Sequence, residues 1–101
     1  MGQALSYKNN ERIKMMALEI HLKGKRACSA GNGGLIILSA AVTKHKSRDV
    51  WDFRVRGITE EKGYEEHLSW IDHQMKVGDT VTIKLIETKE PDKPKRRYRI
   101  P

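Results

Sequence analysis

Hydrophobic and polar residues alternate with a period of two along much of this chain. The alternation is clear in residues 18–22, Leu-Glu-Ile-His-Leu, so an extended segment here has one apolar and one solvated face. Gly24 follows, and glycine readily adopts the positive φ of a tight turn. Residues 25–30 are therefore expected to return antiparallel to the first strand, with Cys28 facing the core. The pattern predicts an opening β-hairpin.

The stretch from Leu35 to Lys46 follows a glycine-rich loop and fits two structures. Its apolar residues line one face of a strand, and an overlapping set lines one face of a helix. Several residues are β-branched, which favours a strand, and glycines at 33–34 occupy the positions where a helix would begin. No Gly or Asn follows as a helix C-cap. We therefore expect a strand, with a helix as the alternative.

The strand pattern returns in the middle of the chain. Trp51, Phe53 and Val55 alternate with charged residues, which predicts a strand with both aromatic side chains in the core. Gly57 is expected to end this strand, because glycine weakens a strand interior.

Two more strands are expected before the C-terminal segment. Residues 59–66 form a polar connection, residues 68–71 are apolar enough for a short strand, and residues 72–74 turn the chain. A Gly-Asp turn then leads into residues 81–85, whose alternating Val, Ile and Leu predict a strand.

Six short extended segments with turn signals between them predict an all-β domain, a small antiparallel β-sandwich or barrel. If residues 35–46 were a helix, the order would become hairpin, helix and strands. That α+β arrangement looks like the β-grasp fold of ubiquitin and the sulfur carriers. Those carriers end in Gly-Gly, whereas this chain ends in Tyr-Arg-Ile-Pro, so a carrier role is not expected.

Charge divides the chain into a body and two ends. The formal net charge is +7, yet residues 16–90 carry 12 Lys and Arg against 11 Asp and Glu. The last segment, 91–101, holds three prolines and five cations and is predicted to form no sheet ladder. We expect a flexible N-terminal extension at 1–15, a β-rich domain at 16–90 and a basic, flexible C-terminal tail at 91–101.

The composition also bears on the cellular compartment in which the protein is expected. Cys28 is the only cysteine, so no intramolecular disulfide can form and a reducing compartment is expected. The longest uninterrupted apolar run, residues 35–38, is far shorter than the roughly 20 residues of a membrane-spanning helix. We expect a cytoplasmic protein with no membrane partner.

The candidate catalytic and metal-binding groups do not form a convincing site. His67 and His73 have carboxylates nearby, but an extended chain would place them on one face roughly 20 Å apart, too far for one metal ion. Cys28 is expected to be a buried core residue rather than a nucleophile. We expect no catalytic residues, no metal site and no cofactor, and hence a protein that is not an enzyme.

Part of the chain resembles a group of short bacterial proteins without an assigned function. The residues that carry the resemblance are Ala17-Leu18-Glu19-Ile20, Leu22, Gly24-Lys25, Cys28 and Ala30-Gly31, then Leu38-Ser39-Ala40 and Val77-Gly78-Asp79. The resemblance implies a single-domain bacterial protein and supplies no active-site residues.

Two sets of residues are candidates for binding. The first is a protein-binding surface formed by Arg54, Arg56, Tyr64, His67 and Trp70. For Trp70 the alternative is a position in the core, where large aromatic residues of β domains usually pack. The second combines five cations with an aromatic ring, which suits single-stranded nucleic acid: Lys93, Lys95, Arg96, Arg97, Tyr98 and Arg99.

We therefore expect a small binding module whose partner is an unidentified protein, engaged through a sheet face or edge. The alternative is non-specific nucleic-acid binding through the basic C-terminal tail. A homodimer formed through a sheet edge is also compatible with the sequence.

Overall fold

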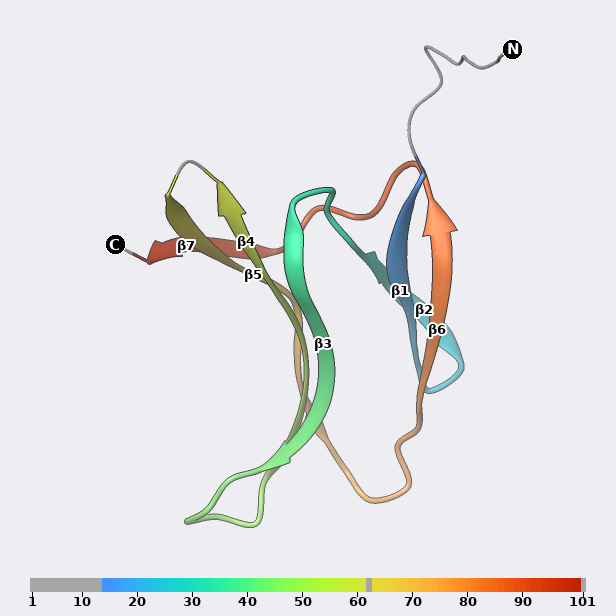
Figure 1. Cartoon of the computed structure of the whole chain (residues 1–101). Helices are drawn as coiled ribbons and strands as arrows, with labels where there is room; N and C mark the ends of the chain where they lie inside the picture. Colours follow the sequence, from blue (N-terminus) through green and yellow to red (C-terminus); the bar gives the residue numbers. More distant parts are fainter. Residues whose placement is uncertain (1–13, 62, 101) are drawn as a thin grey trace, which may run out of the picture.

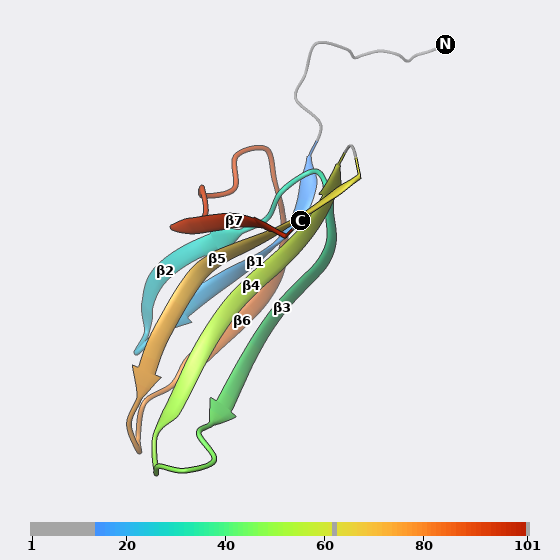
Figure 2. The ribbon, with the colours of Figure 1, turned by 90° about the vertical axis from the view of Figure 1, so that its left-hand side faces the viewer.

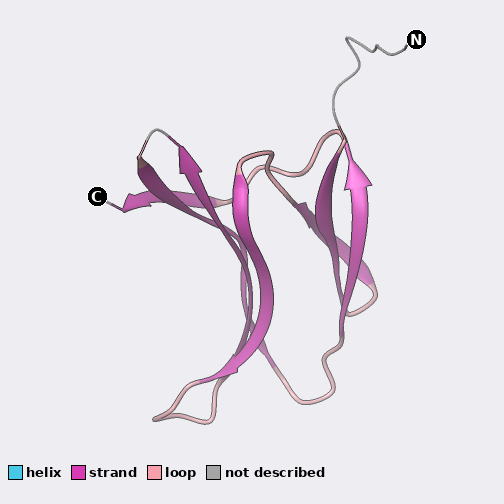
Figure 3. Cartoon of the chain, in the orientation of Figure 1, coloured by secondary structure: helices cyan, strands magenta, loops and turns pink. Residues whose placement is uncertain are grey.

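All regular structure in the described part of this chain is β-strand (Figure 3). The computed structural model describes residues 14–61 and 63–100. Its strands are β1 (Met15–Leu22), β2 (Lys25–Ala30), β3 (Leu35–Lys44), β4 (Trp51–Glu61), β5 (Tyr64–Met75), β6 (Val81–Thr88) and β7 (Arg96–Ile100). The all-β prediction is confirmed, and the β-grasp alternative is wrong because β3 is a strand. The described residues contain no helix that could span a membrane.

The strands form two antiparallel sheets that pack face to face as an open sandwich (Figures 1 and 2). The three-stranded sheet has the order β2-β1-β6, and the four-stranded sheet has the order β3-β4-β5-β7. Between them lies one buried cluster: Ile20, Cys28, Ala30, Phe53, Val55, Leu68, Trp70 and Ile71. Most of the predicted N-terminal extension, residues 1–13, lies outside the described residues, while Met15 already belongs to β1.

The opening hairpin agrees with its prediction. Lys23 and Gly24 connect β1 to β2 with φ angles of 53° and 80°. Two consecutive positive φ values are the requirement of a type I′ turn, whose twist matches that of the flanking strands. Cys28 faces the core, as predicted.

Strands β4 and β5 are much longer than expected. The predicted end at Gly57 and the predicted connection over 59–66 were wrong, because β4 continues to Glu61 and turns through Gly63 directly into β5. A Cβ atom built on Gly57 would lie 2.6 Å from Cδ2 of Leu35 and 3.1 Å from Cζ3 of Trp70. Glycine stands in mid-strand because core side chains occupy that space.

A β-bulge in β5 determines which face each of its residues occupies. Val55 pairs with Ile71 and Arg56 with Ser69, so Trp70 is the extra residue and both Trp70 and Ile71 point into the core. Trp70 is only 2% exposed, so its assignment to the binding surface was wrong and the alternative core assignment is correct. The predicted turn at 72–74 was also wrong, because β5 runs on to Met75.

One side of the sandwich is open. Ile83 and Leu85 of β6 lie opposite Ile20 and Leu18 of β1 and share their inner face, yet both remain exposed. Alternation therefore predicted the direction of these side chains but not their burial. Trp51 is 45% exposed, so its predicted core position was wrong. It begins β4 at the end of the four-stranded sheet that projects past its neighbour (Figure 1).

The other side is closed by the C-terminal segment, which was predicted to form no ladder. That prediction was wrong, since β7 pairs antiparallel with β5 from Ser69↔Arg96 to Glu65↔Ile100. The amide of Lys95 donates to the carbonyl of Ser69 at 2.8 Å. The cations of β7 do not prevent its pairing with β5. Strand β7 is an edge strand, and the side chains of residues 96–99 stay exposed to water whichever face of the sheet they project from.

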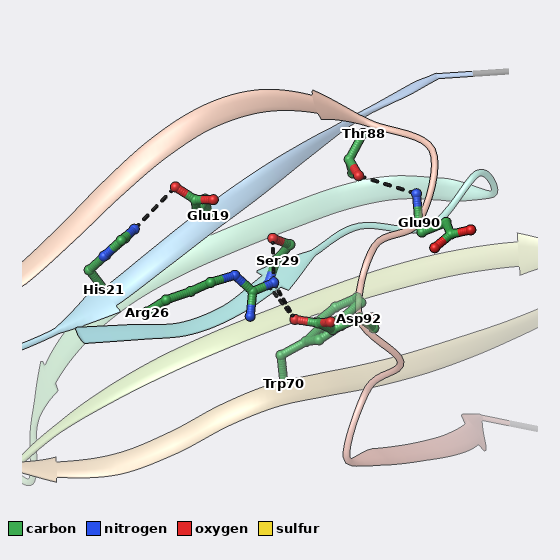
Figure 4. A network of polar contacts seen from close by, with 8 residues as sticks. All are labelled: Glu19, His21, Arg26, Ser29, Trp70, Thr88, Glu90 and Asp92. Atoms are coloured by element: carbon green, nitrogen blue, oxygen red, sulfur yellow. Dashed lines mark hydrogen bonds and ion pairs between the residues drawn. The ribbon is translucent and has the colours of Figure 1, made fainter.

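Asp92 fastens this segment to both sheets (Figure 4). Its amide donates to the carbonyl of Ser29 at 2.8 Å, and its Oδ2 accepts from the amide of Ser29 at 2.8 Å and from Nη2 of Arg26 at 2.9 Å. Its carbonyl accepts from Nε1 of Trp70 at 2.7 Å. These contacts connect β2 in the three-stranded sheet to β5 in the four-stranded sheet.

Replacing Gly57 by alanine should destabilise the protein by about 1–3 kcal/mol, because the new methyl group meets packed core atoms. The measurement is the free energy of unfolding in urea. Gly33→Ala is the matched control, since a Cβ there meets nothing within 4 Å, and its stability should be unchanged or slightly higher. Equal effects of both substitutions would contradict the packing explanation.

The carboxylate of Asp92 should make the stability depend on acid pH. The hydrogen bond from the Ser29 amide, helped by Arg26, lowers the pKa of Asp92 below its ordinary value of 3.8. A lowered pKa stabilises the folded state above the ordinary value, and this stabilisation disappears as the pH falls through the folded-state pKa. Because the side chain is partly solvated, we expect Asp92→Asn to cost about 1 kcal/mol at neutral pH.

The check is urea unfolding of both proteins from neutral pH down to about pH 2, the range in which an aspartate of lowered pKa protonates. The difference between wild type and Asp92→Asn should shrink below the ordinary pKa. Asp49→Asn removes an exposed loop carboxylate and serves as the control. A difference that stays constant to the lowest pH would show that the charge of Asp92 is unimportant.

Candidate functional site

Two neighbouring rows of side chains cross the four-stranded sheet on its outer face, away from the core. Strand register aligns Ser39, Arg56, Ser69 and Arg96 in one row, and Ile37, Ile58, His67 and Tyr98 in the other. Between them runs the row that contains Gly57 and Leu68, which are buried and face the core. Because successive residues alternate between faces, both flanking rows point outward together.

These rows line a hollow of about 310 Å³, together with Asp72, whose carboxylate is paired with Arg54. The row with the two arginines contains only serines at its other positions, and the short serine side chains leave space between the longer ones. The volume is at the small end of the range for ligand sites, which is roughly 300–1,000 Å³. It suits one or two side chains of a partner rather than a large ligand.

Arg56 and Arg96 give the hollow its charge. They come from β4 and β7, which are separated by β5, so their backbones lie about 10 Å apart. Both are exposed, and neither forms an ion pair with another residue in the part of the chain that the structure describes. Two unpaired guanidinium groups beside one hollow favour an anion between them.

Arg54 is two residues from Arg56 on the same face, but it already has acidic partners. Its Nη2 lies 3.4 Å from Oδ2 of Asp52, and its Nε lies 3.4 Å from Oδ1 of Asp72. Asp52 also accepts a 2.7 Å contact from Nε2 of His45. The predicted surface residue Arg54 is therefore part of a local charge network, and Arg56 is the arginine available to a ligand.

The other row supplies apolar and aromatic walls. The rings of His67 and Tyr98 have centroids 5.4 Å apart and are tilted by 36°. Nε2 of His67 lies 3.2 Å from Oε1 of Glu65, which orients the imidazole. Tyr98 is 53% exposed, so its ring offers a face and a hydroxyl to a partner. On the far side, Ile37 and Ile58 provide aliphatic surface.

The structure thus brings together residues from both predicted sets. Arg56 and His67 belonged to the expected protein-binding surface, whereas Arg96 and Tyr98 belonged to the expected nucleic-acid-binding tail. Pairing of β7 with β5 places all four around one hollow. The two predicted sets therefore each contribute residues to the lining of one hollow.

The remaining predicted residues lie elsewhere. Tyr64 and Arg99 alternate onto the opposite face, where the guanidinium carbon of Arg99 lies 4.6 Å from the Tyr64 ring centroid. Arg97 shares that face, and its Nε lies 3.5 Å from Oε1 of Glu66. Lys93 and Lys95 belong to the connection that precedes β7. The cations of the C-terminal segment therefore do not share one face.

The sequence analysis missed seven residues that line the hollow. Four of them stand in the two outward-facing rows, Ile37, Ser39, Ile58 and Ser69, and the others are Gly57, Leu68 and Asp72. Each strand contributes a pair at positions i and i+2, which is the signature of one sheet face. That signal was readable within each strand, but the expected end of β4 at Gly57 removed Ile58 from the sheet. Without the pairing of all four strands, no pattern links these residues.

Two other candidates are less suited to chemistry. Burial raises the pKa of the Cys28 thiol, which keeps it protonated in the core. His67 and His73 were expected on one face, but the bulge at Trp70 places His67 outside and His73 inside. Over residues 14–61 and 63–100, no group of three or more His, Cys, Asp or Glu residues is arranged to hold a metal ion.

No family model, curated protein or solved structure matches this chain. Its function is therefore inferred from its own residues, and above all from the hollow between Arg56 and Arg96.

Proposed function

We propose that this protein is a non-enzymatic binding module that holds an acidic segment of another protein on the outer face of its four-stranded sheet. The observation that supports this proposal is the hollow in which two arginines without described acidic partners meet aromatic and aliphatic walls. A carboxylate of the partner lies between Arg56 and Arg96. A neighbouring apolar side chain of the partner packs against Ile37, Ile58 and Tyr98.

The combination of charge and apolar surface favours a peptide over a nucleic acid. A guanidinium pair binds both carboxylate and phosphate, so the residues around the pair must distinguish the two ligands. The outer face also carries four acidic residues, Asp52, Glu60, Glu65 and Asp72, beside its arginines Arg54, Arg56 and Arg96. Such a face repels a run of phosphates. A single carboxylate in the hollow meets only Asp72 among these four residues, and Arg54 already offsets part of the charge of Asp72.

Cys28 is the only cysteine and is not in a disulfide, which is typical of proteins in a reducing compartment. On that ground we propose a cytoplasmic location. Because Cys28 is buried, it is not expected to react with the partner.

Binding can be tested with an array of acetylated hexapeptides that carry Asp, Glu, Asn or Gln at a central position and varied neighbours. We expect Asp and Glu peptides with an aliphatic neighbour to bind more tightly than their amide counterparts. Arg56→Gln and Arg96→Gln should each weaken this binding about tenfold or more, the loss expected for a charge-assisted hydrogen bond. The measurement is fluorescence anisotropy with the selected peptides.

Arg54→Gln is the matched control. It removes the same charge from the same face, but its guanidinium already has two acidic partners, so affinity should change by less than about threefold. Equal losses in all three variants would indicate only a general charge effect. No preference for acidic peptides over amide peptides would refute the proposed function.

The rival function, nucleic-acid binding by residues 93–99, is measured with a poly-dT oligonucleotide over a salt series. Binding by all five cations would give a log K against log salt slope of about −3 to −4 on a single strand. Tight binding with that slope, unaffected by Arg56→Gln, would favour the rival over the proposed function.

A further inference from the structure

Strand β3 is an unusual sheet edge. The two sheets have four edge strands, β2, β6, β3 and β7, and proteins commonly protect such edges with charged residues or proline. The edge strands β2, β6 and β7 contain Lys25 and Arg26, Lys84 and Glu87, and three arginines respectively. Strand β3, by contrast, is uncharged from Leu35 through Thr43. The free edge of β3 therefore has neither charged residues nor proline over residues 35–43 to prevent pairing with another strand.

The surface beside this edge is apolar. A groove of about 440 Å³ lies between β3 and the edge of the three-stranded sheet, lined mainly by aliphatic residues and methionines that include Met16, Ile36, Leu38 and Leu85. Leu85 is 67% exposed and Ile36 is 57% exposed. Figure 1 shows β3 and β6 on the same open side of the sandwich. An apolar surface beside an unprotected strand edge is typical of an interaction site.

We propose that β3 pairs antiparallel with β3 of a second copy of this chain, joining two four-stranded sheets into one continuous sheet of eight strands across a two-fold axis. An antiparallel pair about such an axis is self-complementary, so one strand supplies both halves of the interface. The axis is perpendicular to the sheet and keeps the two outer faces on the same side.

Charge favours this partner. An antiparallel pair centred near Ser39 and Ala40 places Lys44 of each copy opposite the uncharged start of the other β3, so no like charges meet. The same arrangement of β7 would place arginines opposite arginines. The β3 edge is therefore the edge of the four-stranded sheet that can pair with itself without repulsion.

The same axis accounts for the open side of the sandwich. Because β6 lies on the same side of the sandwich as β3, pairing of the two β3 strands brings the two β6 strands toward each other. The exposed residues Ile83 and Leu85 of this edge strand then lie near the corresponding residues of the other copy. Removal of these apolar side chains from water stabilises the dimer. One interface thus covers both the free edge and the exposed aliphatic residues.

The test uses the full chain and light scattering coupled to gel filtration, from about 1 μM to about 1 mM, the range of weak to moderate homodimers. Wild type should convert from monomer to dimer. The double variant Ala41→Lys/Thr43→Lys should remain monomeric at every concentration, because both positions are exposed on β3. Ala27→Lys/Gln74→Lys adds the same charge at exposed positions on β2 and β5, away from β3 and β6, and should still dimerise.

Hydrogen exchange of wild type provides a second measurement that needs no variant. Amides of β3 that point away from β4 should exchange quickly at low concentration and slowly at high concentration. A monomer at every concentration would overturn the proposal, and so would a dimer that survives Ala41→Lys/Thr43→Lys. Protection of these amides in a monomer would also overturn it, because the edge would then be covered by a segment of the same chain.

Discussion

The connection through Asp92 is the interaction on which the rest of this structure depends. A sandwich of two separate sheets needs contacts that fix how the sheets lie against each other, and apolar packing alone is not directional. Asp92 supplies direction, since its backbone and carboxylate bond to Ser29 of β2 while its carbonyl accepts from the indole of Trp70. The bulge that turns Trp70 inward makes this last contact possible. Asp92 therefore connects the two sheets. It also supplies the hydrogen-bond acceptor that the buried indole N–H of Trp70 requires.

The same residue determines where the chain goes next. From Asp92 the chain needs only a few residues to reach β5, and the amide of Lys95 already bonds to Ser69. Strand β7 then begins at Arg96, opposite Ser69 and in line with Arg56. Arg96 and Tyr98 of the hollow both belong to β7. They reach this position because Asp92 anchors the segment that leads into this edge strand. On the opposite side of the sandwich, between β3 and β6, no similar connecting segment is present among the described residues.

Period-two alternation was sufficient to predict the fold class, because it reports the direction of side chains in each strand separately. The hairpin at Lys23 and Gly24, the burial of Phe53 and Cys28, and the strand at 35–44 all follow from local patterns. Local patterns failed where a distant neighbour decides the structure. Gly57 looks like a strand end until Leu35 and Trp70 are known to occupy the space beside it.

The prediction for the C-terminal segment was wrong for the same reason. Its prolines and cations oppose regular structure locally, yet Pro91 and Pro94 lie before β7, and the free edge of β5 provides a ladder for the five residues that follow them. The candidate site depended on this long-range pairing, so the sequence identified Arg56, His67, Arg96 and Tyr98 without showing that they meet. The serines and isoleucines between them had no signal apart from the strand register.

If both proposals hold, the dimer and the hollow are connected by geometry. In the eight-stranded sheet the two hollows face the same side. The midpoints between Arg56 and Arg96, at β5 of each copy, are five strand spacings apart, or about 24 Å. An extended partner segment covers that distance with about seven residues. Two carboxylates at that separation would engage both copies, and the second contact would form at the high effective concentration of a linked site. Each small hollow binds weakly by itself, because few side chains fit it. Pairing through β3 is therefore the means by which this fold could bind an acidic segment tightly while each contact remains rapidly reversible.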